Sequence, residues 1–180
     1  MGLKFLHLHL HGLIRSKNLE LGRDSDTGGQ TQYVLELVKS LAHAPDVDQV
    51  DLVTRLIADN KIHNDYSKED EFIEPGARIK RFVFGPNKYL RKELLWPYLD
   101  ELIENLINYY QKDENKPAWI HAHYADAGYV GVRLSRAINV PFVFTGHSLG
   151  REKKRKLIDS GLKTNQIEKL YFISKRIKAE

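Results

Sequence analysis

The chain has 180 residues, of which 42% are hydrophobic and 29% charged, and its 28 basic and 24 acidic side chains leave a formal net charge of +4. These values are typical of one soluble globular domain, and they exclude the strongly basic footprint of a nucleic-acid-binding protein and the roughly 20-residue apolar stretch of a membrane span. Cysteine is absent, which excludes disulfides and thiolate metal sites and is typical of a reducing compartment, so we expect a cytoplasmic protein.

The first predicted element is a buried strand over residues 4–10, where apolar side chains are almost continuous. The run alternates with histidine and is too short for a signal peptide. Because His7, His9 and His11 alternate, we expect all three on one face of the sheet. Imidazoles in such a row can bind zinc. No carboxylate cluster with metal-ligand spacing follows them, so packing or hydrogen bonding in the core is the favoured interpretation.

A long loop joins this strand to a predicted amphipathic helix. The loop ends at Gly28 and Gly29, and the helix is expected to bury Tyr33, Val34, Leu37, Val38 and Leu41. A loop between a first strand and a first helix lies in the crevice where open parallel sheets bind ligands. Glycines let a ligand approach the backbone, and the helix start offers free N–H groups to an anion. On the two glycines alone, a plain strand-to-helix turn is the commoner explanation.

The remaining pattern alternates strands with helices. Further strands are predicted over 49–55, 78–84, 119–123 and 141–145, and helical segments over 90–95, from Pro97 to Tyr110, over 129–138, over 151–158 and from Thr164 onward. Residues 58–76 are polar and acidic, so we expect an irregular surface excursion there. Asp126 is expected to cap the helix that follows it. This alternation predicts an α/β fold with a parallel sheet.

Two hydrolase interpretations compete with a simple binding crevice. Gly146–Gly150 reads G-x-S-x-G around Ser148, the pattern of a nucleophile elbow, but that triad needs a histidine after the serine and this chain has none there. The hydrolase triad is therefore disfavoured. A metal-dependent hydrolase built on His7, His9, His121 and His123 is the second alternative, and bound zinc would favour it.

The basic run from Arg151 to Lys156 is typical of a solvated helix face. Because it directly follows a loop on the crevice side, one or two of its charges can turn inward. Arginine suits phosphate through its forked donors, and Arg176 lies in the last predicted helix.

Several sequence motifs of this chain together resemble those of one family. HGLIRSKNLELGRDSDTGGQ, DLVTR, KELLWPYL, HYADAG, FTGHSLG and KRIKAE span nearly the whole chain. They resemble the sucrose-phosphate synthases, retaining glycosyltransferases of family 4 with the GT-B fold of two Rossmann-like halves. Sucrose synthases carry a similar DTGGQ motif, but the sequence between Arg15 and Arg23 is more similar to that of the sucrose-phosphate synthases.

The resemblance implies a Rossmann-like parallel sheet with helices on both faces, covering residues 1–180 as the acceptor-binding, N-terminal half of a GT-B enzyme. The chain stops at Glu180 inside a predicted helix, so we expect a truncated domain whose C-terminal nucleotide-sugar domain is absent. The implied reaction transfers glucose from UDP-glucose to fructose 6-phosphate, giving sucrose 6-phosphate and UDP. We expect little or no activity from this chain alone. Transfer to free fructose and a non-catalytic phosphosugar-binding domain stay open as alternatives.

The resemblance also implies roles for individual residues. His147, Gly29 and Asp126 would be catalytic, with the backbone carbonyl of His147 near the glucosyl ring, and Gly28 and Gly29 would bind the diphosphate. The implied contacts to fructose 6-phosphate are Gly28, Gln30, Lys88, Tyr124, Ser148, Lys153, Lys175 and Arg176, and His11 would lie beside the sugar site. The family requires no metal or cofactor, and the sequence does not indicate magnesium as an activator. The expected partners are the two substrates and the second domain, with no nucleic acid or membrane.

Overall fold

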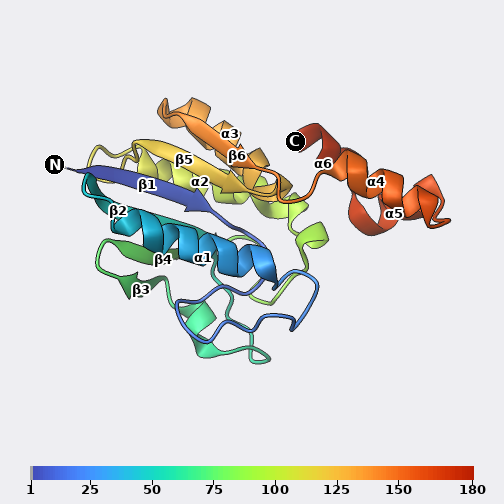
Figure 1. The fold of residues 1–180 in the computed structure, drawn as a ribbon, viewed down its shortest axis with the longest axis horizontal. Coiled ribbons are helices and arrows are strands. Elements are labelled where there is room, and N and C mark those ends of the chain that lie inside the picture. Colours follow the sequence, from blue (N-terminus) through green and yellow to red (C-terminus); the bar gives the residue numbers. More distant parts are fainter. Residues whose placement is uncertain (1) are drawn as a thin grey trace.

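A six-stranded sheet in the order β3-β4-β2-β1-β5-β6 runs through the molecule (Figure 1). The computed structural model describes residues 2–180. The strands are β1 (Leu3–Leu8), β2 (Val47–Arg55), β3 (Asp70–Glu74), β4 (Ala77–Phe82), β5 (Trp119–His123) and β6 (Phe142–Thr145). Every neighbouring pair is parallel except β3 and β4, which are antiparallel. The predicted α/β fold is confirmed.

Helices cover both faces of the sheet. They are α1 (Gly29–Ala42), α2 (Leu99–Tyr110), α3 (Ala125–Ile138), α4 (Gly150–Asp159), α5 (Thr164–Tyr171) and α6 (Ile173–Ala179), with short 3-10 turns η1 (Asn64–Ser67), η2 (Lys92–Leu94) and η3 (Trp96–Tyr98). None of the helices among residues 2–180 has the length and apolar character that crossing a bilayer requires. Helices α4, α5 and α6 lie beyond the carboxyl ends of the strands (Figure 1).

The two faces of β1 belong to two different hydrophobic cores. Leu6 and Leu8 pack in the core that α2 and α3 complete, whereas Phe5 packs with Val34 and Val38 of α1. Successive side chains of a strand point to opposite faces, so a strand buried on both sides is almost continuously apolar, as predicted. The predicted apolar stripe of α2 is buried at Leu99, Leu102, Ile103, Leu106 and Tyr110.

Strand order reverses between β1 and β5. From β1 the chain moves outward through β2 and β4, and it then returns to place β5 on the other side of β1. Open α/β sheets bind ligands outside the carboxyl ends of the strands at such a switch point. The loops after β1 and β5 are therefore the expected location of a site.

Five local expectations were wrong. Residues 70–74 form β3 rather than an irregular surface excursion. The strand lies at the edge of the sheet and is partly solvated, with Phe72 68% exposed. Its sequence therefore lacks the apolar pattern that predicts a buried strand. Tyr33 is 49% exposed and Leu35 takes the buried position of α1. Phe172 has a φ of 46°, which breaks the helix predicted from Thr164 into α5 and α6.

The fourth concerns the loop after β5. Helix α3 begins at Ala125 rather than Tyr129, so Asp126 lies in its first turn and Tyr124 is the N-cap residue. Asp126 therefore does not cap the helix from outside, although its Oδ1 accepts a hydrogen bond from the N–H of Ala127 at 2.7 Å. Strand β1 also ends at Leu8, so of its three alternating histidines only His7 lies in the strand.

Candidate functional site

A cavity of about 460 Å³ opens at the carboxyl ends of β1, β5 and β6. We call it the crevice. It is lined by His11, Ser25, Asp26, Gly28, Gly29, Gln30, Lys92, Tyr124, His147, Ser148 and Lys153. These residues come from the loops after three different strands, from α1, from η2 and from α4, so the crevice exists only in the folded chain.

The amino terminus of α1 forms one wall of the crevice. Helix α1 starts at Gly29, its N-cap Gly28 has an extended backbone with φ −140°, and the helix has no side-chain cap and no acidic residue in its first turn. A Cβ added at Gly28 or Gly29 would meet nothing within 4 Å. The fold itself therefore does not demand glycine at either position. Free N–H groups, a positive helix end and open space together suit an anionic ligand.

The loop that carries these glycines is held by its own side chains. The Thr27 hydroxyl accepts a hydrogen bond from the N–H of Leu13 at 3.0 Å, and Asp24 accepts from the N–H groups of Asp26 and Thr27 at 2.8 Å each. Gly12 has a φ of +76°, and a Cβ there would lie 2.3 Å from the carbonyl oxygen of Asp26. The loop is consequently ordered before any ligand arrives.

Three cations approach the opposite wall. Lys92, Lys153 and Arg176 line a small cavity beside the crevice together with Glu93 and Tyr124. The guanidinium carbon of Arg176 lies 4.4 Å from the centre of the Tyr124 ring, and Nζ of Lys153 lies 4.1 Å from the centre of the Tyr171 ring. Burial, with the nearby charges of Lys92 and Arg176, holds the pKa of Lys153 below its ordinary value. An anion placed here would relieve that repulsion.

Acidic groups balance part of this charge. Burial alone would raise the pKa of Asp26, but hydrogen bonds from the side chain and backbone of Lys92 outweigh it and hold the pKa below its usual value. Arg176 donates from Nε to Glu180 at 2.9 Å and from Nη2 to the hydroxyl of Ser148 at 2.8 Å. Arg176 thereby ties α6 to the loop after β6.

Two residues of the crevice have a positive φ although they are not glycine. His147 has a φ of 52° and Tyr124 a φ of 77°. Non-glycine residues with positive φ are costly and cluster at functional sites. Nε2 of His147 shares a hydrogen bond with Nδ1 of His123 at 3.1 Å, and the Tyr33 ring meets the His147 ring edge-on, with centroids 5.4 Å apart. Burial, with the charge of His11, lowers the pKa of His147.

His11 is oriented by a buried carboxylate. Its Nδ1 lies 2.8 Å from Oδ2 of Asp126, and both side chains are at most 5% exposed. The pair joins the loop after β1 to the first turn of α3. Asp126 thus acts on the crevice through His11 and through the backbone of Ala127.

Most of the predicted site residues meet in one place. Gly28, Gly29, Gln30, Tyr124, His147, Ser148 and Lys153 line the crevice, and Asp126 and Arg176 line the adjoining cavity. The structure does not bring Lys88 or Lys175 to the lining. Lys88 is exposed in the loop after β4 and its carbonyl accepts from Arg55 at 2.9 Å, while Lys175 lines a separate cavity with Trp96 and Tyr129.

Sequence reasoning missed Lys92 and Asp26. Lys92 lies in the motif KELLWPYL and Asp26 in the motif DSDTGGQ, but the spacing of the two motifs does not show that these side chains meet. Asp26 and Lys92 are 66 positions apart in the sequence, and only the tertiary fold brings them together.

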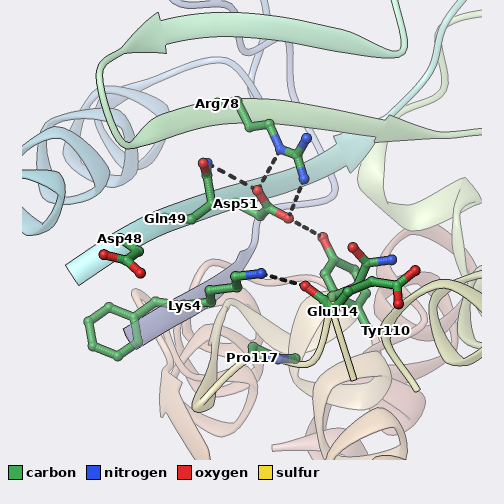
Figure 2. A pocket seen from close by; sticks show the side chains of 10 residues that line it. Lys4, Asp48, Gln49, Asp51, Arg78, Tyr110, Glu114 and Pro117 are labelled. Atoms are coloured by element: carbon green, nitrogen blue, oxygen red, sulfur yellow. Dashed lines mark hydrogen bonds and ion pairs between the residues drawn. The ribbon is translucent and has the colours of Figure 1, made fainter. Parts of the chain in front are cut away.

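A second cavity, of about 270 Å³, lies at the amino ends of the strands (Figure 2). Its centre is Asp51, which accepts from Arg78 at 2.7 Å and from the hydroxyl of Tyr110 at 2.9 Å. The Lys4 ammonium there donates to the carbonyl of Glu114. Asp51 and Arg78 thus neutralise each other at the centre of this cavity.

Comparison with known proteins shows which sequences this chain is similar to. The sequence profile described as Glycosyl transferase 4-like domain matches residues 28–169. The chain is 42% identical to probable sucrose-phosphate synthase 2 of Arabidopsis thaliana, over 96% of this chain and 19% of that protein, and 41% identical to the sucrose-phosphate synthase of Spinacia oleracea over the same shares. It spans about a fifth of the length of these relatives.

The fold also matches a solved structure. The sucrose-phosphate synthase from Thermosynechococcus elongatus superposes with a TM-score of 0.71 at 29% identity, over 85% of this chain and 35% of the other. The matched part thus includes most of the sheet and helices described above.

Proposed function

Because this chain belongs to the family of glycosyl transferase 4-like domains, we propose that it forms the acceptor side of a retaining sucrose-phosphate synthase. Such an enzyme transfers glucose from UDP-glucose to fructose 6-phosphate and releases sucrose 6-phosphate and UDP. The observation that carries the proposal is the pairing, across one crevice, of an uncapped helix amino terminus with Lys92 and Lys153. A donor diphosphate and an acceptor phosphate are the two anions that this reaction must hold.

The diphosphate would lie against Gly28 and Gly29. As the bond between the anomeric carbon and the diphosphate oxygen breaks, negative charge grows on the leaving group. The uncapped backbone N–H groups at the start of α1 would stabilise that charge without reorganising. The open space around both glycines gives the phosphate oxygens close access to the backbone.

The phosphate of fructose 6-phosphate would lie among Lys92, Lys153 and Arg176. Holding the phosphate fixes the distance and direction of the sugar hydroxyl that forms the new bond to the anomeric carbon, which is a positioning effect. Lys153 suits this role because its charge is incompletely balanced in the folded chain. Ser148 is presented on the same wall by its bonds to Arg176.

His147 would face the glucosyl ring. Positive charge develops on that ring as the leaving group departs, and the backbone carbonyl of His147 would offer a dipole to it. The positive φ of His147, 52°, is a strained backbone conformation of the kind that clusters at functional sites. His11, held by Asp126 at 2.8 Å, would contact the donor or acceptor hydroxyls.

A second Rossmann-like domain would hold the nucleotide. The share of each relative that this chain covers, 19% of the Arabidopsis protein and 35% of the solved structure, supports that division. On this proposal the 180-residue chain binds fructose 6-phosphate weakly and UDP still more weakly, and it has little transferase activity alone. The cytoplasmic location expected from the sequence stays a prediction.

Two experiments test the proposal. Product analysis of the full-length protein, with UDP-glucose or ADP-glucose as donor and fructose 6-phosphate or fructose as acceptor, should give sucrose 6-phosphate from the phosphorylated acceptor. Sucrose as the main product would favour a sucrose synthase, and binding without turnover would favour a regulatory phosphosugar-binding domain. Calorimetric titration of the 180-residue chain with UDP is the second experiment. A micromolar affinity would contradict the proposal that the second domain, and not this chain, holds the nucleotide.

A further inference from the structure

Three histidines gather on one face of the sheet where β1 lies beside β5. His7 and His121 are register partners on the two parallel strands, and His123 follows two residues later, so it points to the same face. One ring nitrogen of each residue lies within 4.8 Å of the other two. His7 and His123 are fully buried and His121 is 9% exposed.

The hydrogen bonds of these rings are incompletely satisfied. Nδ1 of His7 and Nε2 of His123 share one hydrogen bond at 3.1 Å, but Nε2 of His7 is buried without a partner among the described residues. A buried polar atom left in this way is costly. A hydrogen bond between two imidazoles needs one N–H donor and one lone pair, so one of these two facing nitrogens carries no proton.

We propose that His7, His121 and His123 bind one transition-metal ion of the zinc class. Zinc takes imidazole nitrogens at about 2.0–2.1 Å in a tetrahedral arrangement, which places two ligand nitrogens about 3.3 Å apart. The facing nitrogens of His7 and His123 are 3.1 Å apart, so an ion can replace the proton that they share. A set of imidazoles without a carboxylate selects zinc, cobalt or nickel over magnesium and calcium.

The neighbours of the cluster have the arrangement of an outer shell. Nε2 of His121 lies 2.7 Å from the hydroxyl of Thr145, and Nδ1 of His123 lies 3.1 Å from Nε2 of His147. If each of these nitrogens carries the proton, the other nitrogen of the same ring is free to bind an ion. Such hydrogen bonds orient metal-binding histidines.

The other histidines nearby are already engaged. Nδ1 of His9 lies 3.0 Å from Nε2 of Gln30, its Nε2 lies 3.4 Å from the Thr31 hydroxyl, and His11 is held by Asp126. The proposed site therefore has three protein ligands and leaves a fourth position open. The ion would cross-link β1 to β5 next to His147, which contacts the ring of His123. This inference does not depend on the proposed sugar chemistry.

Metal titration tests the site. The 180-residue chain, stripped with a chelator, is titrated with Zn²⁺ by calorimetry and with Co²⁺ by visible absorption, which reports tetrahedral ligation. We expect one equivalent per chain and a rise in melting temperature with zinc. His7→Gln and His121→Gln should each lower the affinity at least tenfold. His43→Gln and His63→Gln, which remove exposed histidines elsewhere, should bind as the unmodified chain does.

Each result has a defined meaning. If the unmodified chain binds neither ion stoichiometrically, or if His7→Gln and His121→Gln bind normally while an exposed histidine matters, the site does not exist. Circular dichroism and thermal unfolding report whether a variant folds. Where His7→Gln does not fold, His121→Gln and the cobalt spectrum of the unmodified chain decide. Loss of metal binding with phosphosugar binding intact would support the metal site alone.

Discussion

Lys92 holds Asp26 through two hydrogen bonds. Its backbone N–H donates to Oδ2 of Asp26 at 2.8 Å, and its ammonium group donates to Oδ1. The carboxylate is fully buried and the Lys92 side chain is 14% exposed. This contact joins the loop after β1 to η2, and it fixes both the glycine wall and the cationic wall of the crevice.

The contact predicts an acid-sensitive contribution to stability. Because the folded pKa of Asp26 is lowered, the pair stabilises the fold fully above the unfolded value of about 3.9, and this stabilisation disappears as the pH falls through the folded pKa. Asp26→Asn should destabilise the chain by about 2 kcal/mol at pH 7 and by less at pH 3. Urea unfolding at both pH values measures this, and an equal loss at both would contradict it.

Lys92 and Lys88 make a test between sequence and structure. The resemblance assigns the acceptor phosphate to Lys88, whereas the structure brings Lys92 to the crevice. Lys92→Met, made together with Asp26→Asn so that no buried charge is left unpaired, should weaken fructose 6-phosphate binding about tenfold. Lys88→Met should change it by less than twofold in calorimetric titration. The opposite ranking would restore the role of Lys88.

Gly28 and Gly29 should tolerate alanine in the fold but not in the reaction. Alanine meets no atom within 4 Å at either position. At Gly29, inside α1, it should add about 0.5–1 kcal/mol of stability. Both variants should lower kcat/KM for UDP-glucose in the full-length protein at least tenfold, because the methyl group occupies the space of the phosphate. Unfolding curves and steady-state kinetics on the same preparations separate the two effects.

Lys153 should contribute most to discrimination between a phosphorylated and a free sugar. Lys153→Ala removes one charged hydrogen bond of about 1.5–3 kcal/mol, so affinity for fructose 6-phosphate should fall about 10- to 100-fold while affinity for fructose stays unchanged. Lys156→Ala, a change on the same helix at a side chain that is 72% exposed, is the matched control. An equal loss for both sugars would place Lys153 outside the phosphate site.

The lowered pKa of Lys153 predicts a pH dependence of binding. Burial and its cationic neighbours favour the neutral amine, whereas a bound phosphate dianion favours the ammonium form. Affinity should therefore fall at a lower alkaline pH than an ordinary lysine would give, and binding there should take up protons. Calorimetry in buffers of different ionisation enthalpy measures the uptake, which Lys153→Ala should abolish.

The sequence was sufficient for the α/β fold, the glycine loop and most crevice residues. Strands buried on both faces and helices with one apolar stripe leave strong periodic signals, as in residues 4–10 and 99–110. It was insufficient at β3, where an edge strand mixes polar and apolar residues, and at Phe172, where a single left-handed residue divides a periodic run into two helices.

Contacts between distant segments needed the tertiary structure. The sequence motifs indicated that Gly28, His147 and Lys153 lie near strand ends. Because parallel strands bring their carboxyl ends to one edge of the sheet, these residues could be expected to meet. Which lysine reaches the crevice, and which histidines face one another, depends on strand order and register. Lys92 approaches Asp26 because the segments that follow β4 and β1 meet in the fold, and His7 lies beside His121 because β5 returns to the side of β1 opposite β2. No local periodicity records that choice, since it comes from the packing of the whole sheet.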